Sequence, residues 1–352
     1  GGLSFKVSEI GFMALTEGGP GRQAPYLAKG HWVIVDLEEI GPDDLESWLA
    51  SSHALVAAKL TRTVKLVRLF IASWFVGAVA AGIVRGATSA GSGTDAVVDG
   101  ICLTQVALAA MLILLGGFVE GFGFGLSLGT HWPYTRNIFV LALQGDPEAA
   151  HRLAATLVGV IGVILAILAP GSATISGLAL VVVTAAFGVG TLHVLAGRMP
   201  SIVHGVHGLL AYGVFLCYLS AFVVHDIDFW PYLKATVALH AVLLAVLLGG
   251  MTTGQRGFGT GIGAFDWPRR NAQWVVITHV LAALAVVATL GSLMPTYPAA
   301  FYLAVGQVAV GFLIFHAVNL RPKTPGILVG FHQGMALFIT LAIVAVQGSG
   351  TH

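Results

Sequence analysis

Charged residues are scarce in this chain of 352 residues, because Lys, Arg, Asp and Glu together make up only 9% of it. A soluble domain of this length carries about 25%. Apolar residues make up 57% of the chain, and the mean hydropathy is +0.89. This composition excludes a soluble globular protein, a disordered chain and a nucleic-acid partner. The apolar residues form unbroken runs instead of alternating with polar ones, which also disfavours a membrane β-barrel.

Cysteine is nearly absent. The two cysteines, Cys102 and Cys217, both lie inside apolar runs. A disulfide framework is therefore excluded, and so is a cysteine-based metal or iron–sulfur site. No cleavable signal peptide is expected from the first residues.

The charges that exist are unevenly distributed, and nearly half of them fall within the first 68 residues. Residues 1–60 are therefore predicted to be a polar N-terminal extension. Within it, residues 31–36 are typical of a strand, and residues 41–45 of a helix start with acids at the positive end of the dipole. We interpret the extension as an amphipathic segment on the membrane surface in preference to a catalytic domain.

The rest of the chain contains nine runs of about 20 apolar residues, the length needed to cross a bilayer. The predicted fold class is an all-α polytopic membrane protein. The predicted spans are residues 66–85, 101–119, 153–170, 173–196, 203–224, 232–250, 273–294, 298–318 and 326–347.

The sequence contains an internal repeat, which bears on the whole architecture. The second span ends in Gly116-Gly117, followed by a glycine-rich loop and Trp132-Pro133. The sixth span ends in Gly249-Gly250, followed by a similar loop and Trp267-Pro268. These loops do not follow strands, so they are not phosphate-binding fingerprints.

Histidines follow the same repeat. His151 and His207 are 56 residues apart, and His279 and His332 are 53 apart. The repeat predicts two pseudo-symmetric four-helix bundles, residues 101–224 and 225–352. Residues 61–100 then form one additional transmembrane helix and its loop.

A histidine within a membrane span needs a partner and is a functional candidate. Imidazole is a common axial ligand of haem iron, so each pair is predicted to hold the iron of a haem b. The alternative is a structural histidine bonded to a carbonyl group, and a different histidine could replace a proposed ligand. The replacements considered are His193, His204 and His316.

Arginines at the same level could pair with the two haem propionates, because guanidinium and carboxylate groups form bidentate pairs. The candidates are Arg152, Arg198 and Arg321, with Arg256 as a further one. The alternative is that they only anchor helix ends at the lipid headgroups.

These motifs resemble those of the heme A synthase family over residues 101–347. The resemblance rests on Leu115-Gly116-Gly117 with its glycine-rich loop, on Trp132-Pro133, and on Glu148-x-x-His151-Arg152. The other three histidines fall where the family places its helix-borne histidines.

The resemblance implies a membrane oxidoreductase that oxidises the C8 methyl of heme O to a formyl group, giving heme A. It implies substrate haem between His151 and His207, and a permanent haem b between His279 and His332 that passes electrons. Glu148 is the implied catalytic carboxylate; alternatively, it only stabilises a helix N-terminus. The expected location is the cytoplasmic membrane of a prokaryote or an equivalent energy-transducing membrane.

Three features depart from the family. Val280 follows His279 where the family often has arginine, the first large loop lacks the cysteine pair of many members, and the N-terminal helix and extension are extra. The basic residues also lie on the haem side, which the positive-inside rule places in the cytoplasm, opposite to the family. The alternative function is therefore a dihaem cytochrome b-like electron-transfer or anchor subunit of a membrane respiratory complex, with a redox partner. A transporter is disfavoured, because the charges cluster at one edge.

Overall fold

The computed structural model describes residues 2–25, 31–89, 93–128, 138–225, 227–256, 260–263 and 267–349, without the side chains of residues 39, 53–64 and 349. Trp132, Pro133 and Arg136 lie outside the described residues. The chain divides into two compact units, residues 1–67 and 68–352.

The first unit is a small α/β unit. Strands β1 (Gly2–Lys6), β2 (Gly21–Gln23) and β3 (Trp32–Asp36) form an antiparallel sheet in the order β1-β3-β2. Apolar side chains of the sheet and of helix α1 (Glu9–Glu17) form its core, together with Trp48, whose ring stacks on Phe5 at 5.6 Å. The sequence predicted only β3 of this sheet.

Helix α2 (Pro42–Thr88) begins at the predicted proline, with Asp43 and Asp44 in its first turn, and runs without a break into the first span. A short 3-10 helix, η1 (Leu37–Glu39), precedes it. The predicted helix start at residues 41–45 is therefore confirmed.

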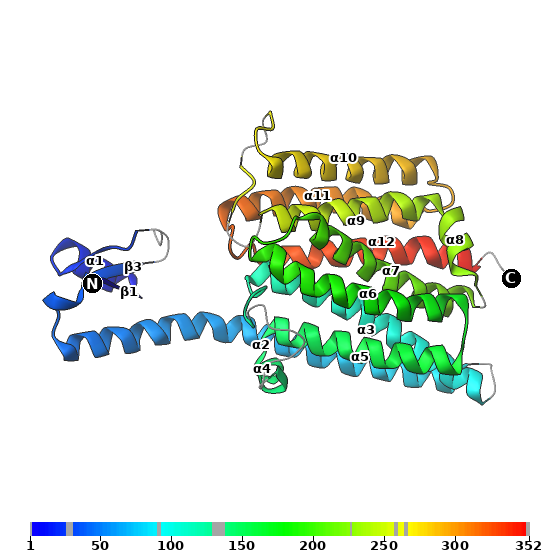
Figure 1. The fold of residues 1–352 in the computed structure, drawn as a ribbon, viewed down its shortest axis with the longest axis horizontal. Helices are drawn as coiled ribbons and strands as arrows, with labels where there is room; N and C mark the ends of the chain where they lie inside the picture. Colours follow the sequence, from blue (N-terminus) through cyan, green and yellow to red (C-terminus); the bar gives the residue numbers. More distant parts are fainter. Residues whose placement is uncertain are drawn as a thin grey trace. The chain divides into compact units, whose positions relative to one another are not determined.

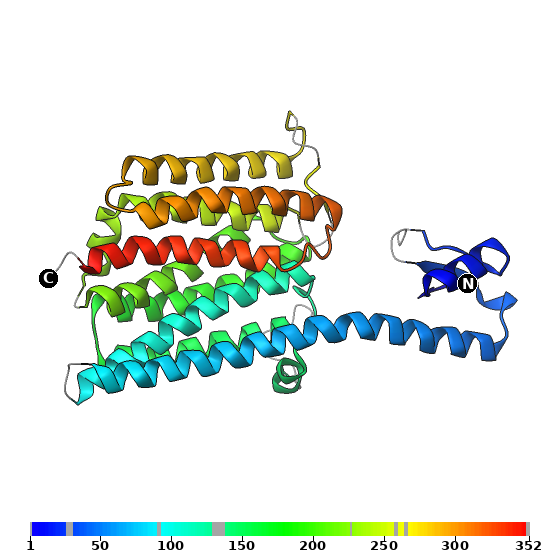
Figure 2. The same ribbon diagram turned by 180° about the vertical axis from the view of Figure 1, so that it is seen from behind.

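The second unit is helical, and Figures 1 and 2 show its long helices running side by side. Nine helices of the described chain are long and apolar enough to cross a membrane, as predicted. Eight follow α2: α3 (Thr94–Phe122), α5 (Pro147–Leu168), α6 (Ser172–Leu195), α7 (Ile202–Val224), α9 (Val237–Arg256), α10 (Asn271–Ser292), α11 (Pro298–Leu320) and α12 (Leu328–Ser349).

Two short helices, α4 (Ile138–Gln144) and α8 (Phe229–Ala235), were not predicted. Helix α5 begins six residues before the predicted start, because Asp146 caps it by accepting a hydrogen bond from Ala149 N and Pro147 fits its first turn. The sixth span begins five residues later than predicted, after Thr236 separates α8 from α9.

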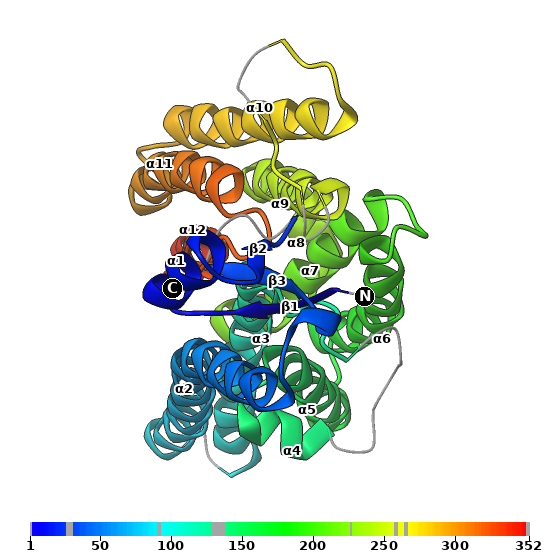
Figure 3. The same ribbon diagram turned by 90° about the vertical axis from the view of Figure 1, so that its left-hand side faces the viewer.

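The end-on view in Figure 3 shows how these helices are grouped. Helix α3 packs against α5, α7 and α12, and α7 also packs against α6 and α9. Helix α10 lies at the edge and packs against α9 and α11, and α11 packs against α12.

Glycines allow the closest of these approaches. A Cβ on Gly117 of α3 would lie 2.8 Å from Cα of Gly330 in α12. A Cβ on Gly250 of α9 would lie 2.9 Å from Cα of Gly205 in α7. Small residues of this kind let helix backbones meet inside a membrane.

Candidate functional site

A cavity of about 2080 Å³ lies among α3, α5, α6, α7 and α9–α12. Pockets for single small ligands usually measure about 300–1000 Å³, so this cavity has room for two large ligands. Its lining is mostly apolar, and six histidines contribute to it. They are His151, His204, His207, His279, His316 and His332.

Three of these histidines are oriented by the same backbone contact. Nδ1 of His151 lies 3.1 Å from the carbonyl oxygen of Leu112. Nδ1 of His207 lies 3.0 Å from that of Thr184, and Nδ1 of His279 lies 3.0 Å from that of Ala245. A carbonyl oxygen only accepts, so each Nδ1 carries the proton and each Nε2 presents its lone pair.

A glycine lies four residues after each of those carbonyl groups. A Cβ on Gly116 would lie 3.5 Å from Cε1 of His151, and a Cβ on Gly188 would lie 3.3 Å from Cε1 of His207. A Cβ on Gly249 would lie 3.1 Å from Cε1 of His279. We call this combination of a carbonyl group and a glycine on the preceding span a histidine seat.

His332 has half of such a seat. A Cβ on Gly311 would lie 3.4 Å from its Cε1, and the residue four positions earlier is Gln307. Here Gln307 Nε2 donates to the His332 carbonyl oxygen, and Nδ1 of His332 is buried without a hydrogen-bond partner among the described residues. The rings of His279 and His332 are neighbours in an edge-on arrangement, with centroids 6.4 Å apart and planes at 72°.

Glu148 is buried at the start of α5, and both of its carboxylate oxygens are engaged. Oε1 lies 2.6 Å from Nη2 of Arg152. Oε2 accepts hydrogen bonds from Ser127 Oγ at 2.9 Å and from Leu128 N at 3.1 Å. Glu148 therefore connects Arg152 to the loop that follows α3.

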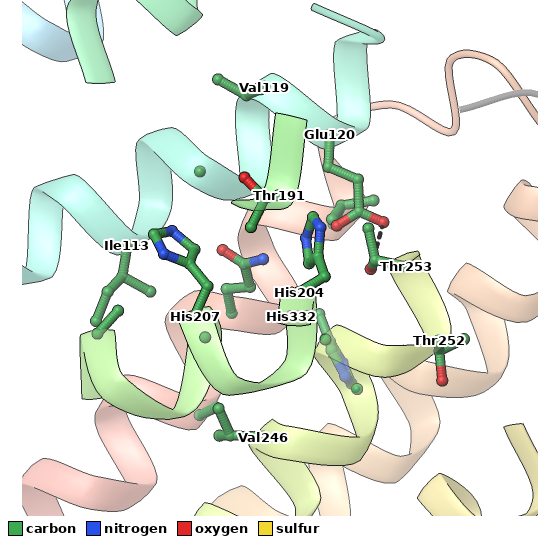
Figure 4. Close-up of a pocket in the computed structure, with 18 of the residues that line it drawn as sticks. Ile113, Val119, Glu120, Thr191, His204, His207, Val246, Thr252, Thr253 and His332 are labelled. Atoms are coloured by element: carbon green, nitrogen blue, oxygen red, sulfur yellow. Dashed lines mark hydrogen bonds between the residues drawn. The ribbon is translucent and has the colours of Figure 1, made fainter. Parts of the chain in front are cut away.

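A second buried ion pair links the two halves of the repeat. Oε1 of Glu120 in α3 accepts from Thr253 Oγ1 of α9 at 2.9 Å (Figure 4). It also accepts from Arg256 Nη2 of α9 at 3.2 Å. In the alignment of the two glycine-rich segments, Glu120 and Thr253 occupy equivalent positions. Arg256 also donates to the carbonyl oxygen of Pro322 at 2.8 Å.

The arginines that line the cavity are not the set that the sequence predicted. Arg152 and Arg256 line the cavity, and so does Arg270, which the sequence reasoning did not single out. Arg198 and Arg321 are exposed and are not part of this lining in the described chain. Both follow the C-terminal ends of their helices, α6 and α11.

Of the alternative histidines, His204 and His316 line the cavity, whereas His193 is not among the described lining residues. His316 packs edge-on against Phe312, with ring centroids 4.5 Å apart. The histidine seats were missed at the sequence level. Their signal was present, because a glycine precedes each of the four repeat histidines at a corresponding place on the preceding span.

Among the described residues, no group of three or more His, Cys, Asp or Glu side chains could hold a metal ion. No protein-family model, curated protein or solved structure matches the chain.

Proposed function

We propose that this integral membrane protein binds haem between His151 and His207 and between His279 and His332. The histidine seats are the observation that supports it. In metalloproteins a ligating histidine usually donates its other ring N–H to a carbonyl or carboxylate group, which fixes the tautomer and the ring orientation. Three of the four histidines meet that requirement.

The dimensions of the second pair also fit. An imidazole nitrogen lies about 1.1 Å from its ring centroid and a metal–histidine bond is about 2.0 Å long, so two axial rings on one iron have centroids about 6 Å apart. The separation between His279 and His332 is 6.4 Å. A pair of histidines is sufficient for this group, because the porphyrin supplies the other four ligands of the iron.

We further propose that α3, α5, α6 and α7 form one four-helix bundle and α9–α12 a second, related by a pseudo-twofold axis. Two pairs of close glycine contacts favour this arrangement. Gly117 meets Gly330, and Gly250 meets Gly205, so the first helix of each half contacts the last helix of the other. The hydrogen bond between Glu120 and its repeat equivalent Thr253 agrees with an axis passing nearby.

For activity, we propose a heme A synthase-like oxidoreductase that takes heme O as substrate in the first half. The two halves carry different side chains at the start of the helix that bears the first histidine of each pair, which favours different roles for the two halves. The first half carries Glu148 and Arg152, whereas the corresponding positions of the second half are Val276 and Val280. When bound in the second half, haem b supplies a one-electron redox centre.

In this account each residue has a separate task. His151 and His207 orient the substrate between α5 and α7, and Arg152 faces its polar edge. Glu148 holds Arg152 and the loop after α3 in place, so we assign it a positioning role. This differs from the catalytic role expected from the sequence, because hydrogen bonds already occupy both carboxylate oxygens.

Because both carboxylate oxygens of Glu148 are already hydrogen-bonded, Glu148 has no free oxygen for catalysis. This also favours a second candidate, a dihaem cytochrome b-like electron-transfer subunit. To separate the two, purified protein is incubated with heme O, a reductant and oxygen, and the extracted haems are analysed by chromatography and mass spectrometry. Formation of heme A or of its hydroxylated precursor supports the synthase. Unchanged heme O, together with a reversibly reducible haem b in both halves, supports the electron carrier.

A further inference from the structure

His204 is a half-buried polar residue that has no part in the proposed iron ligation. It lies in the first turn of α7, three residues before His207, and lines the cavity. Its Nδ1 is buried and has no hydrogen-bond partner among the described residues. Buried polar atoms are almost always paired, so each exception calls for an explanation.

The surroundings of His204 differ from those of an iron ligand. A histidine seat anchors Nδ1 to a carbonyl group and places a glycine under Cε1, and His204 has neither contact. Gly254 of α9 approaches it from another side, where an added Cβ would lie 2.9 Å from the Cβ of His204. His204 is therefore not held in a way that would present Nε2 to a metal.

The polar side chains near His204 already have hydrogen-bond partners other than His204. Figure 4 shows His204 beside His207 on α7, with Thr191, Glu120 and Thr253 on the same side of the cavity. Thr253 donates to Glu120, and Thr191 donates to the carbonyl oxygen of Gly188 at 2.7 Å. A partner for the ring of His204 is therefore to be sought on a ligand in the cavity that it lines.

The position of His204 indicates what that ligand group is. His204 is one helical turn nearer than His207 to the N-terminus of α7, where the helix dipole favours a negative charge. An imidazole N–H at this place is a donor suited to a carboxylate oxygen.

We propose that His204 donates a hydrogen bond from its ring N–H to a carboxylate of the planar tetrapyrrole held between His151 and His207. This inference rests on the proposed haem binding. The equivalent position in the second half, three residues before His332, is Val329, so only the first half makes this contact. His204 is then a specificity residue that distinguishes the two sites.

The test is a titration of haem-depleted, full-length protein in detergent with ferric haem and, separately, with its dimethyl ester. The ester has the same ring and iron but no free carboxylates. We expect His204→Ala to weaken haem binding at one of the two sites about tenfold, the loss for one hydrogen bond to a charged group. The ester should bind this variant and the wild type equally, and His204→Asn, which keeps an N–H donor, should retain most of the affinity for haem.

His193→Ala is the matched control, since it removes a histidine that is not among the described lining residues, and it should change neither titration. Unaltered haem affinity in His204→Ala would overturn the inference, and so would an equal loss for haem and ester. Loss of the bis-histidine absorption spectrum in His204→Ala would also overturn it, because it would identify His204 as an iron ligand. Failure of the wild type to take up haem would instead overturn the proposed haem binding itself.

Discussion

The imidazole ring of His279 is held from two sides, by the carbonyl group of Ala245 and by the flat surface that Gly249 leaves open. Replacing Gly249 with alanine would place a methyl group 3.1 Å from Cε1. This is closer than an ordinary contact, so the ring must shift away from its carbonyl partner. We predict that Gly249→Ala lowers the haem content of the purified protein by up to half, measured from the pyridine haemochrome spectrum.

The control for this variant is Gly77→Ala in α2, where an added Cβ meets no atom within 4 Å. It should leave the haem content unchanged. A Gly249→Ala protein with full haem content and an unaltered spectrum would show that the seat does not orient the ligand.

Glu148 and Arg152 form a buried ion pair, with side-chain exposures of 5% and 9%. Removing one partner of such a pair leaves an unpaired buried charge and typically costs about 3–5 kcal/mol. We predict that Glu148→Ala markedly lowers the thermal unfolding temperature in detergent and also loosens the loop at Ser127. Circular dichroism melts measure the first effect, and limited proteolysis measures the second.

The pair Arg85–Asp99 provides the comparison, because its side chains are 39% and 18% exposed. Pairs of this kind contribute only about 0–1 kcal/mol. Asp99→Asn should therefore have a small effect. Equal effects of the two substitutions would contradict the role given to Glu148.

At the level of elements, the helix contacts between the two halves depend on paired glycines. A methyl group at Gly250 would meet the backbone of Gly205 at 2.9 Å, and backbone atoms cannot move aside as a flexible side chain can. Overpacking of this kind costs about 1–3 kcal/mol. We predict that Gly250→Ala destabilises the second unit by this amount, read from thermal or denaturant unfolding in micelles.

Gly208, on α7, provides a matched position, because its added Cβ would make only an ordinary contact of 4.0 Å with Val246. Gly208→Ala should be neutral or slightly stabilising, since alanine favours the helix. If both variants were equally stable, the close approach of α7 and α9 would be in doubt.

Hydropathy could predict the nine spans, because length and apolar content alone decide whether a helix can cross a bilayer. It could not fix their ends where a cap such as Asp146 or a break such as Thr236 decides them. Strand β3 was visible as an apolar run, whereas β1, of the same five residues, has only Leu3 and Phe5 as large apolar side chains, and β2 has three residues. Both depend on pairing with β3, and strands of this kind carry little signal of their own.

The candidate site was predictable only in part. The repeat identified His151, His207, His279 and His332, and all four line one cavity. It did not show which arginines reach that cavity, since Arg198 and Arg321 are placed outside by the turns that follow their helices. Arg270 reaches the cavity because Nη2 bonds to the Ile262 carbonyl oxygen, a tertiary contact that no local pattern reveals.

For the whole molecule, the orientation in the membrane follows from the exposed basic residues. Among the described residues of the second unit, the end of the spans that carries Glu148 has six exposed basic side chains, and the opposite end has Arg85 and Lys234. The six are Arg68, Arg198, Arg269, Arg270, Arg321 and Lys323. Basic loops are usually cytoplasmic, so we predict that the end with Glu148 faces the cytoplasm.

Cysteine labelling can test this orientation with little background, because Cys102 and Cys217 are both buried. An impermeant maleimide should label Arg198→Cys only in inside-out vesicles and Lys234→Cys only in right-side-out vesicles. The reverse pattern would place the cavity's polar end outside the cytoplasm.

The central claim is that two histidine pairs each hold a haem, and quantifying extracted haem per chain tests it most directly. The measurement uses the purified wild type, the variants His151→Ala and His279→Ala, and the control His193→Ala, with the haem types identified by chromatography. We predict two haems per chain in the wild type and the control, and one in each of the other variants. Wild-type protein without haem, or with haem that survives both substitutions, would contradict it.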